Sequence, residues 1–198
     1  MTKKILTLLA CFMAIMGGSA CSGANAGNKT ETKDAESSTL LSGKKVLVAY
    51  FSWGGNTKHV AEYIAQQTGG TLFRIEPQTP YPTEYQPCTE VAKEEKEKNA
   101  RPAIKGKVDN MAQYDVVFIG CPVWWWTAPM IINTFTESYD FKGKTVVPFC
   151  TYAATYRDET LQKIVDLTPA ANHLKGFGAV NNSTEGIDEW LKEIGKKK

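Results

Sequence analysis

The amino-acid sequence predicts an α/β fold, with a five-stranded parallel sheet covered by helices on both faces. From residue 45 onward, short and nearly continuous apolar runs alternate with segments that repeat apolar residues at helical spacing. The apolar runs indicate strands that are buried on both faces, and strands that alternate with helices favour parallel pairing. The roughly 155 residues in this part of the chain are enough for one domain with a proper core.

The strands and helices can be placed in order along the chain. Strands are expected at 45–51, 71–76, 115–119, 145–149 and 174–180. Helices are expected at 57–67, 129–139, 158–167 and 184–194, and Gly69 with Gly70 ends the first of them. The first three helices each lie between two strands, as parallel connections require, and the fourth follows the last strand.

One long segment, 77–107, interrupts this alternation. Thr83 and Gln86 have the spacing of a capping box, which predicts that a helix begins there. The interior of that helix is mainly Lys and Glu, as expected of a solvated surface helix. Because long loops are often functional, a second interpretation is a cover over a ligand, with Tyr81 and Tyr85 as candidates to touch it.

The N-terminal twenty residues have the layout of an export signal, because Lys3 and Lys4 precede an apolar stretch that is too short to span a bilayer permanently. The small residues before Cys21 favour lipid attachment there, as in a bacterial lipoprotein. Cleavage after Ala24-Asn25-Ala26 is the alternative, and it would release a soluble periplasmic or secreted protein. We therefore expect a lipid anchor in the cell envelope, with 1–20 as signal, 21–43 as a disordered polar tether and 44–198 as the folded domain.

Charge and cysteine content exclude several classes of protein. Without Lys3 and Lys4, the 21 remaining basic residues equal the 21 acidic residues, so nucleic-acid binding is disfavoured. The folded region keeps Cys88, Cys121 and Cys150, an odd set without a C-x-x-C spacing. We therefore expect neither a metal site nor a disulfide framework.

Three of the five tryptophans stand side by side as Trp124-Trp125-Trp126, in a loop between a predicted strand and a predicted helix. Consecutive side chains of an extended segment point to opposite faces, so the three indoles cannot all enter one core. At least one must face a cavity, a groove or solvent. We favour a flat ligand as the reason for the run; core packing and a membrane-surface belt are the alternatives.

The loop after the first predicted strand is rich in glycine and hydroxyl groups and spans residues 52–57. Glycines let the backbone approach a phosphate, and free N–H groups at a helix start donate to it. The loop has neither the G-K-[ST] ending of a nucleoside-triphosphate loop nor a G-x-G-x-x-G dinucleotide motif. It predicts a single monoester phosphate held by backbone and hydroxyl groups, with an ordinary capped turn as the alternative.

These loops are expected to meet. In an open parallel sheet, ligands bind outside the carboxyl ends of the strands where the strand order reverses. For the order 2-1-3-4-5, these ends carry the loop 52–57, the tryptophan loop and the segment 150–156. A phosphate cradle and an aromatic wall would then face one crevice.

The same residues resemble the flavodoxin family, most closely its envelope-associated branch with a P-x-W-W loop. The resemblance extends from residue 45 to the C-terminus and rests on 49–57, on 119–125 with the T-A-P-M that follows soon after, and on 146–151. It implies a three-layer flavodoxin-like sandwich with FMN as cofactor. The residues implied to bind FMN are Ser52, Trp53, Gly54, Gly55, Asn56 and Thr57 in the phosphate loop, Pro122, Val123, Trp124, Trp125, Trp126 and Thr127 against the ring, and Thr151, Tyr152 and Tyr156 along its other edge.

Two departures from the family pattern affect the ring site. The family usually has Gly where Trp126 stands, and a Gly- and Ser-rich stretch where this chain has 152–156. The aromatic residues either form a tighter box around the ring or fill its place.

The resemblance implies an electron carrier, in which the cofactor supplies the redox chemistry and no catalytic side chain is required. Redox proteins or small quinone-like acceptors would be its partners, and the N-terminal lipid its only membrane contact. An NAD(P)H-dependent flavin or quinone reductase is one alternative. A binding module that keeps the scaffold without the cofactor is the other.

Overall fold

The structure is a computed structural model that describes residue 41 and residues 43–195. The expected signal, the predicted lipid attachment site Cys21 and nearly all of the expected tether lie outside the described residues. The elements, in chain order, are β1 (Val46–Tyr50), α1 (Asn56–Thr68), β2 (Thr71–Arg74), β3 (Glu76–Pro77), α2 (Tyr85–Glu97), β4 (Ile104–Lys105), the 3-10 turn η1 (Met111–Gln113), β5 (Val116–Pro122), α3 (Met130–Glu137), β6 (Thr145–Tyr152), α4 (Arg157–Asp166), β7 (Asn172–His173), β8 (Phe177–Val180) and α5 (Ile187–Ile194).

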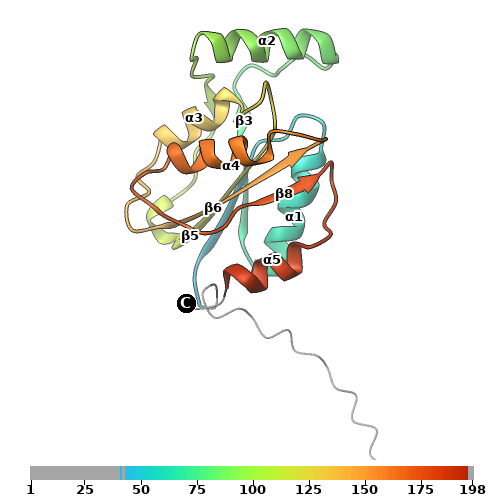
Figure 1. Cartoon of the computed structure of the whole chain (residues 1–198). Coiled ribbons are helices and arrows are strands. Elements are labelled where there is room, and N and C mark those ends of the chain that lie inside the picture. Colours follow the sequence, from blue (N-terminus) through green and yellow to red (C-terminus); the bar gives the residue numbers. More distant parts are fainter. Residues whose placement is uncertain (1–40, 42, 196–198) are drawn as a thin grey trace, which may run out of the picture. The chain divides into compact units, whose positions relative to one another are not determined.

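The central sheet is parallel and has the order β2-β1-β5-β6-β7, with β8 also paired to β6 (Figure 1). This confirms the predicted order 2-1-3-4-5 when β7 and β8 count as the fifth strand. The prediction of one continuous strand at 174–180 was wrong. The interruption lies opposite Pro148, which has no N–H to donate to a neighbouring strand and which packs closely on Gly176.

Helices cover both faces of the sheet, which confirms the three-layer arrangement. Alternate residues of β1 enter different clusters, Leu47 and Ala49 on one face and Val46 and Val48 on the other. The first cluster includes apolar residues of α3 and α4, and the second includes those of α1 and α5. Because β1 lies between two cores, all five of its residues are buried, as its continuous apolar sequence predicts.

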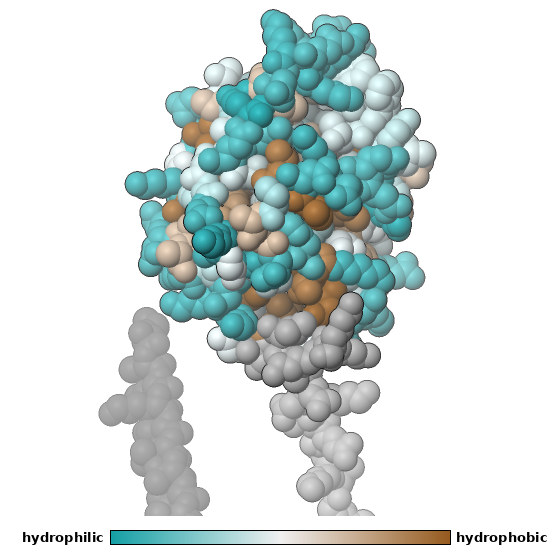
Figure 2. Space-filling model, turned by 60° about the vertical axis from the view of Figure 1, so that its left-hand side comes forward, coloured by the Kyte–Doolittle hydropathy of each residue, from teal (hydrophilic) through white to brown (hydrophobic). Residues whose placement is uncertain are grey.

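Helix α2 lies apart from these two helical layers, at the top of the view in Figure 1. It stands in an excursion whose ends are joined by the short antiparallel pair β3 and β4. Among its residues only Cys88 and Ala92 are buried. The upper end of the molecule in Figure 2 is correspondingly hydrophilic, so the outer face of α2 is solvated as predicted.

The predicted capping box of α2 was wrong. The residue before the helix is Glu84, and no side chain caps the helix start. The Gln86 side chain instead donates to Glu90 one turn further along (3.0 Å). The glutamine therefore bonds to another side chain on the helix surface, as residues four apart commonly do.

Strands β5 and β6 continue beyond their predicted ends at residues 119 and 149. Their ladder extends to the pairs Cys121 with Cys150 and Pro122 with Thr151. Three predicted ligand residues, Pro122, Thr151 and Tyr152, therefore stand on strands and not in loops. Within the described residues, no helix is long and apolar enough to cross a membrane, and no group of His, Cys, Asp and Glu is placed to hold a metal ion.

Candidate functional site

The loop between β1 and α1 forms a cradle of backbone N–H groups. Ser52 is buried, and its Oγ accepts the N–H of Gly55 (3.2 Å). Gly55 has φ +96°, a conformation that glycine adopts without strain. The first intrahelical bond of α1 runs from the N–H of His59 to Gly55, so the three N–H groups before it have no partner within the helix.

The space in front of this cradle is open and electrostatically suited to an anion. A Cβ atom placed on Gly54 or Gly55 would meet no atom within 4 Å. The first turn of α1 carries no acidic residue. Unpaired N–H groups and the helix dipole together favour negative charge at this position.

A buried hydroxyl pair joins the cradle to the sheet. Thr57 Oγ1 and Thr151 Oγ1 lie 2.7 Å apart, and both residues are almost completely buried. Thr57 belongs to the first turn of α1, and Thr151 stands near the end of β6. Beside them lies a cavity of about 240 Å³, lined by Ser52, Trp53, Gly54, Asn56, Thr57, Pro122, Val123, Trp124, Thr151, Tyr152, Ala153 and Asn181.

The tryptophan run forms a tight hairpin turn and is not extended. Trp124 and Thr127 exchange both of their backbone hydrogen bonds (2.9 and 3.1 Å). Trp125 and Trp126 occupy the two central positions with φ +45° and +69°. Positive φ at both central positions is the pattern of a type I′ turn, which glycine and asparagine normally occupy.

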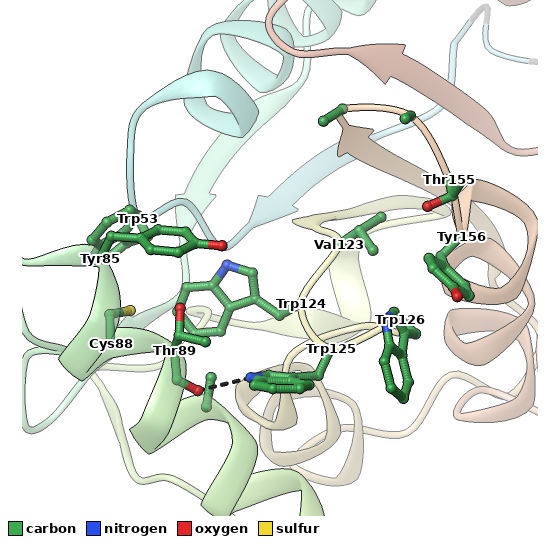
Figure 3. A pocket seen from close by; sticks show the side chains of 13 residues that line it. Trp53, Tyr85, Cys88, Thr89, Val123, Trp124, Trp125, Trp126, Thr155 and Tyr156 are labelled. Carbon is green, nitrogen blue, oxygen red and sulfur yellow. Dashed lines mark hydrogen bonds between the residues drawn. The ribbon is translucent and has the colours of Figure 1, made fainter.

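The three indoles have different surroundings, as Figure 3 shows. Trp124 packs edge-on against Phe51 and Tyr81, with ring centroids 5.1 and 5.0 Å away. The Trp125 indole donates to the backbone carbonyl of Thr89 on α2 (2.8 Å). Trp126 is 56% exposed, and its ring centroid lies 5.9 Å from that of Tyr156. The expectation that at least one indole faces a cavity or solvent is thus confirmed.

Helix α2 is attached to the tryptophan turn by two lysines as well. Lys96 Nζ donates to the carbonyl of Trp125 (2.7 Å) and lies 4.9 Å from the centroid of the Trp126 ring. Lys93 Nζ lies 5.6 Å from the Trp125 ring. Such cation–π contacts stabilise by about 0.5–1 kcal/mol at exposed sites. In the segment before α2, the carbonyl of Pro82 accepts the indole N–H of Trp53 (2.9 Å).

A second cavity of about 530 Å³ lies between α2, the tryptophan turn and the loop after β6 (Figure 3). Aromatic side chains from all of these segments surround it. Its lining consists of Trp53, Tyr85, Cys88, Thr89, Ala92, Val123, Trp124, Trp125, Trp126, Ala153, Ala154, Thr155 and Tyr156. The two cavities share Trp53, Val123, Trp124 and Ala153, so they adjoin each other.

Backbone strain is concentrated at the larger cavity. Six non-glycine residues in the described part of the chain have positive φ, and three are asparagines, which tolerate it. The other three are Trp125, Trp126 and Tyr156, and all of them line this cavity. Bulky residues in this conformation cost about 1–3 kcal/mol each and persist only where the surrounding structure enforces them.

The cavities are uncharged. Among the described residues, no Asp, Glu, His, Lys or Arg lines either of them. Cys88 lines the larger cavity, and burial raises its thiol pKa. Cys121 and Cys150 are paired in register on β5 and β6 and fully buried as free thiols, and burial raises the pKa of Cys150 to about 12. These thiols are therefore protonated at neutral pH and weakly nucleophilic.

The structure brings thirteen of the fifteen residues of the predicted FMN site to the walls of the two cavities. Gly55 and Thr127 line neither cavity but shape the turns that do. Of the two tyrosines considered as a cover, Tyr85 lines the larger cavity, whereas Tyr81 lies behind Trp124. The predicted contacts between these residues and FMN itself stay predictions.

Sequence reasoning missed several lining residues. Asn181 directly follows β8, so the rule that placed the other loops at the carboxyl ends of strands applies to it as well. Thr89 and Ala92 enter from α2. The mainly charged sequence of α2 gives no signal for an inward-facing side.

Comparisons with known proteins agree with this architecture. A family model described as Flavodoxin matches residues 45–194. A structure from Bacteroides eggerthii is 39% identical, with a TM-score of 0.68, over 78% of this chain and 99% of that one. A structure from Bacteroides uniformis is 36% identical, with a TM-score of 0.67, over 76% and 99%. Both are assigned as flavoproteins by name.

A more distant structure has the same fold. It is a flavoprotein from Lactobacillus acidophilus in complex with FMN, 22% identical, with a TM-score of 0.64, over 74% of this chain and 98% of that one. The search of curated proteins found no match. Since the family model spans the whole folded region from β1 to α5, the chain belongs to the flavodoxin family.

Proposed function

We propose that the protein binds FMN in its two adjoining cavities and carries electrons in the bacterial cell envelope. The observation that supports this best is the shared wall of the cavities, formed in part by Trp53, Val123 and Trp124. A ligand with a phosphate at one end and a flat ring at the other could occupy both cavities at once. FMN has this form, and the related Lactobacillus acidophilus flavoprotein was solved in complex with it.

The smaller cavity fits the phosphate end. The open N–H groups at the start of α1 and the hydroxyls of Ser52 and Thr57 are neutral donors of the kind that bind a monoester phosphate. The Thr57 hydroxyl already has a partner in Thr151, so the pair can donate only one of its two protons elsewhere. A second phosphate would find no cationic side chain in the described lining.

The aromatic side chains that line the larger cavity are suited to a flat ring. Four of the six exposed large hydrophobic side chains in the described residues are Trp53, Tyr85, Trp126 and Tyr156, and all four line it. Apolar side chains gathered around one cavity indicate a ligand site. The strained backbone of Trp125, Trp126 and Tyr156 supports the same inference, since strain of this kind is typical of functional sites.

One contact restricts where the ring can lie. The centroids of Trp126 and Tyr156 are 5.9 Å apart, whereas a ring stacked between two others needs about 7 Å, twice the optimal contact distance between carbon atoms. These two side chains must therefore separate for a ring to lie between them. A ring that instead lies against the Trp124 and Trp125 side would leave the contact intact.

Bound FMN would supply the redox chemistry, and the chain's residues would bind, orient and shield it. The described lining contains no carboxylate, imidazole or ammonium group that could exchange a proton with a substrate. This favours a carrier over a reductase. We further propose lipid attachment at Cys21, and redox proteins or small quinone-like acceptors as partners, with neither nucleic-acid binding nor other membrane contact.

Titration of the purified apoprotein with FMN tests the proposal. We expect quenching of tryptophan fluorescence and a protein-bound flavin absorption band at micromolar FMN, because six of the residues lining the larger cavity are aromatic and four of these are tryptophans. No band and no quenching would contradict FMN binding. Rapid NADPH oxidation by the loaded protein with added quinone would contradict the carrier and favour the reductase.

A cofactor-free binding module is the second candidate. The observation that favours it is the contact between Trp126 and Tyr156, which closes part of the aromatic cavity. The same titration separates the two candidates. A module that has lost its cofactor would bind neither FMN nor riboflavin, although its exposed aromatic side chains remain available to another flat ligand.

A further inference from the structure

We infer that the ammonium group of Lys96 strengthens binding of reduced FMN relative to oxidised FMN and so raises the reduction potential of the site. This inference rests on the proposed function, because it concerns the same cavity. It assigns a role to a residue on α2, outside the loops of the predicted FMN site. Lys96 would be a positioning and tuning residue, since it acts through the two indoles that it contacts.

Lys96 lies against the tryptophan turn, on the side away from the larger cavity. Lys96 Nζ is 2.7 Å from the carbonyl oxygen of Trp125 and 4.9 Å from the centroid of the Trp126 ring. Both indoles line the larger cavity, whereas Lys96 does not. The positive charge therefore lies directly behind the aromatic wall. Lys96 is also only half-buried, so it can keep its charge without the penalty of full desolvation.

No carboxylate of α2 forms an ion pair with Lys96. Helix α2 has four glutamates, and all of them bond elsewhere. Glu94 and Glu97 pair with Lys98 and Lys93, whereas Glu90 and Glu95 bond to the neutral side chains of Gln86 and Tyr81. Lys93 also faces an indole of the turn, but Glu97 lies 3.7 Å from it and offsets its charge.

A second ion pair lies at the far side of the cavity from α2. At the start of α4, next to Tyr156, Arg157 and Asp158 form an ion pair (2.8 Å). The described lining contributes no formal charge of its own. Among the described residues, Lys96 is consequently a lysine that contacts the aromatic wall directly and has no ion-pair partner.

The effect of Lys96 on a bound flavin ring would be electrostatic. Electrons added to a bound flavin ring leave it with negative charge unless protons follow, and no acidic or basic side chain of the described lining is placed to supply them. A positive charge behind the ring stabilises the negative form more than the neutral one. Indole groups between the two charges exclude water, so the attraction is screened less than at an open surface.

The test compares affinities for the two redox forms of FMN. Dissociation constants for oxidised FMN and, under anaerobic conditions, for reduced FMN are measured for the wild type and for Lys96→Met, together with the midpoint potential. We expect Lys96→Met to weaken reduced FMN binding about tenfold more than oxidised FMN binding, which lowers the potential by about 30 mV for a two-electron couple. Lys96→Arg keeps the charge and should stay close to the wild type.

Two matched controls sharpen the result. Lys93→Met removes the neighbouring lysine whose charge Glu97 offsets, and Lys98→Met removes an exposed lysine paired with Glu94; both should change the ratio of the two affinities less than Lys96→Met. The Lys96 effect should also shrink in high salt, because this lysine is partly exposed.

The possible outcomes distinguish this inference from the proposed function. Equal losses of affinity for both redox forms in Lys96→Met would show a merely structural role and overturn the inference while leaving FMN binding intact. Dissociation constants that do not change for either redox form would overturn it as well. A wild-type protein that binds neither form of FMN would overturn both proposals.

Discussion

The phosphate end and the ring end of the candidate site are built in different ways. The phosphate cradle comes from one contiguous loop and the first turn of α1, with hydrogen bonds such as that between Ser52 and Gly55 spanning three residues. The aromatic cavity joins α2, the turn after β5 and the loop after β6. The first is local and the second is a product of tertiary packing.

The two ends also place their strain differently. In the cradle, positive φ falls on Gly55, where it costs little. At the ring end it falls on Trp125, Trp126 and Tyr156, and bonds from α2 hold the turn in place. The cradle can therefore be recognised as a motif, whereas the aromatic cavity depends on a helix that the motif does not contain.

The largest expected effect breaks the cradle alone. Gly55→Ala forces a side chain into φ +96°, and strain of about 1–3 kcal/mol should weaken FMN binding roughly tenfold to a hundredfold. Riboflavin, which lacks the phosphate, should bind nearly as it does to the wild type. Gly69→Ala is the control, because Gly69 has φ +64° at the opposite end of α1. It should lose stability in denaturant unfolding without losing FMN affinity.

A somewhat smaller effect on FMN affinity is expected when the Trp126 side chain is removed from the ring end of the site. Trp126→Gly relieves a strained φ and removes the contact with Tyr156, so FMN affinity should rise up to about tenfold if separating that aromatic pair costs about 0.5–1.5 kcal/mol. Trp126→Ala removes the same contact but keeps the strain. If both variants bind FMN more weakly in fluorescence titrations, Trp126 is part of the wall that stacks on the ring.

The attachment of α2 to the tryptophan turn can be tested with a variant that keeps an aromatic side chain at position 125. Trp125→Phe deletes the N–H that donates to Thr89 and should cost about 1 kcal/mol in denaturant unfolding. FMN affinity should fall with it, because α2 forms one wall of the cavity. Trp190→Phe deletes a similar indole bond to Lys175 on the opposite face of the sheet. Equal losses of FMN affinity in the two variants would argue against a specific role for α2.

The smallest effect concerns a carboxylate behind the ring end. Burial raises the pKa of Glu95, although the hydrogen bond from Tyr81 lowers it. A raised pKa in the folded state means that the stability contributed by Glu95 is present in acid and is lost as pH rises through that pKa. Glu95→Gln should therefore gain stability relative to the wild type between pH 4 and pH 7, measured by denaturant unfolding.

Glu137 provides a control of opposite sign. The hydrogen bond from Arg101 lowers its pKa, so its contribution is present at neutral pH and is lost in acid. Glu137→Gln should lose stability relative to the wild type over the same interval. The same sign of change in both variants would contradict the assigned environments.

Much of the fold and more than half of the residues that line the two cavities follow from the sequence. Strand order, the two helical layers and the position of the cradle could be predicted because they depend on apolar periodicity and on short-range turn chemistry. The break in the last strand was not predicted, because Pro148, the residue that explains it, lies on β6 and meets the break only across the sheet.

The sequence by itself determined that three adjacent indoles could not share one core, because neighbouring side chains diverge along any chain. Only the tertiary structure decided where each indole lies. Helix α2 is charged on its outer side, and nothing in its sequence indicates that Thr89 accepts a bond from Trp125 or that Lys96 lies over Trp126. The two contacts join residues that are 36 and 30 positions apart in the sequence. Local sequence patterns do not encode contacts between residues so far apart.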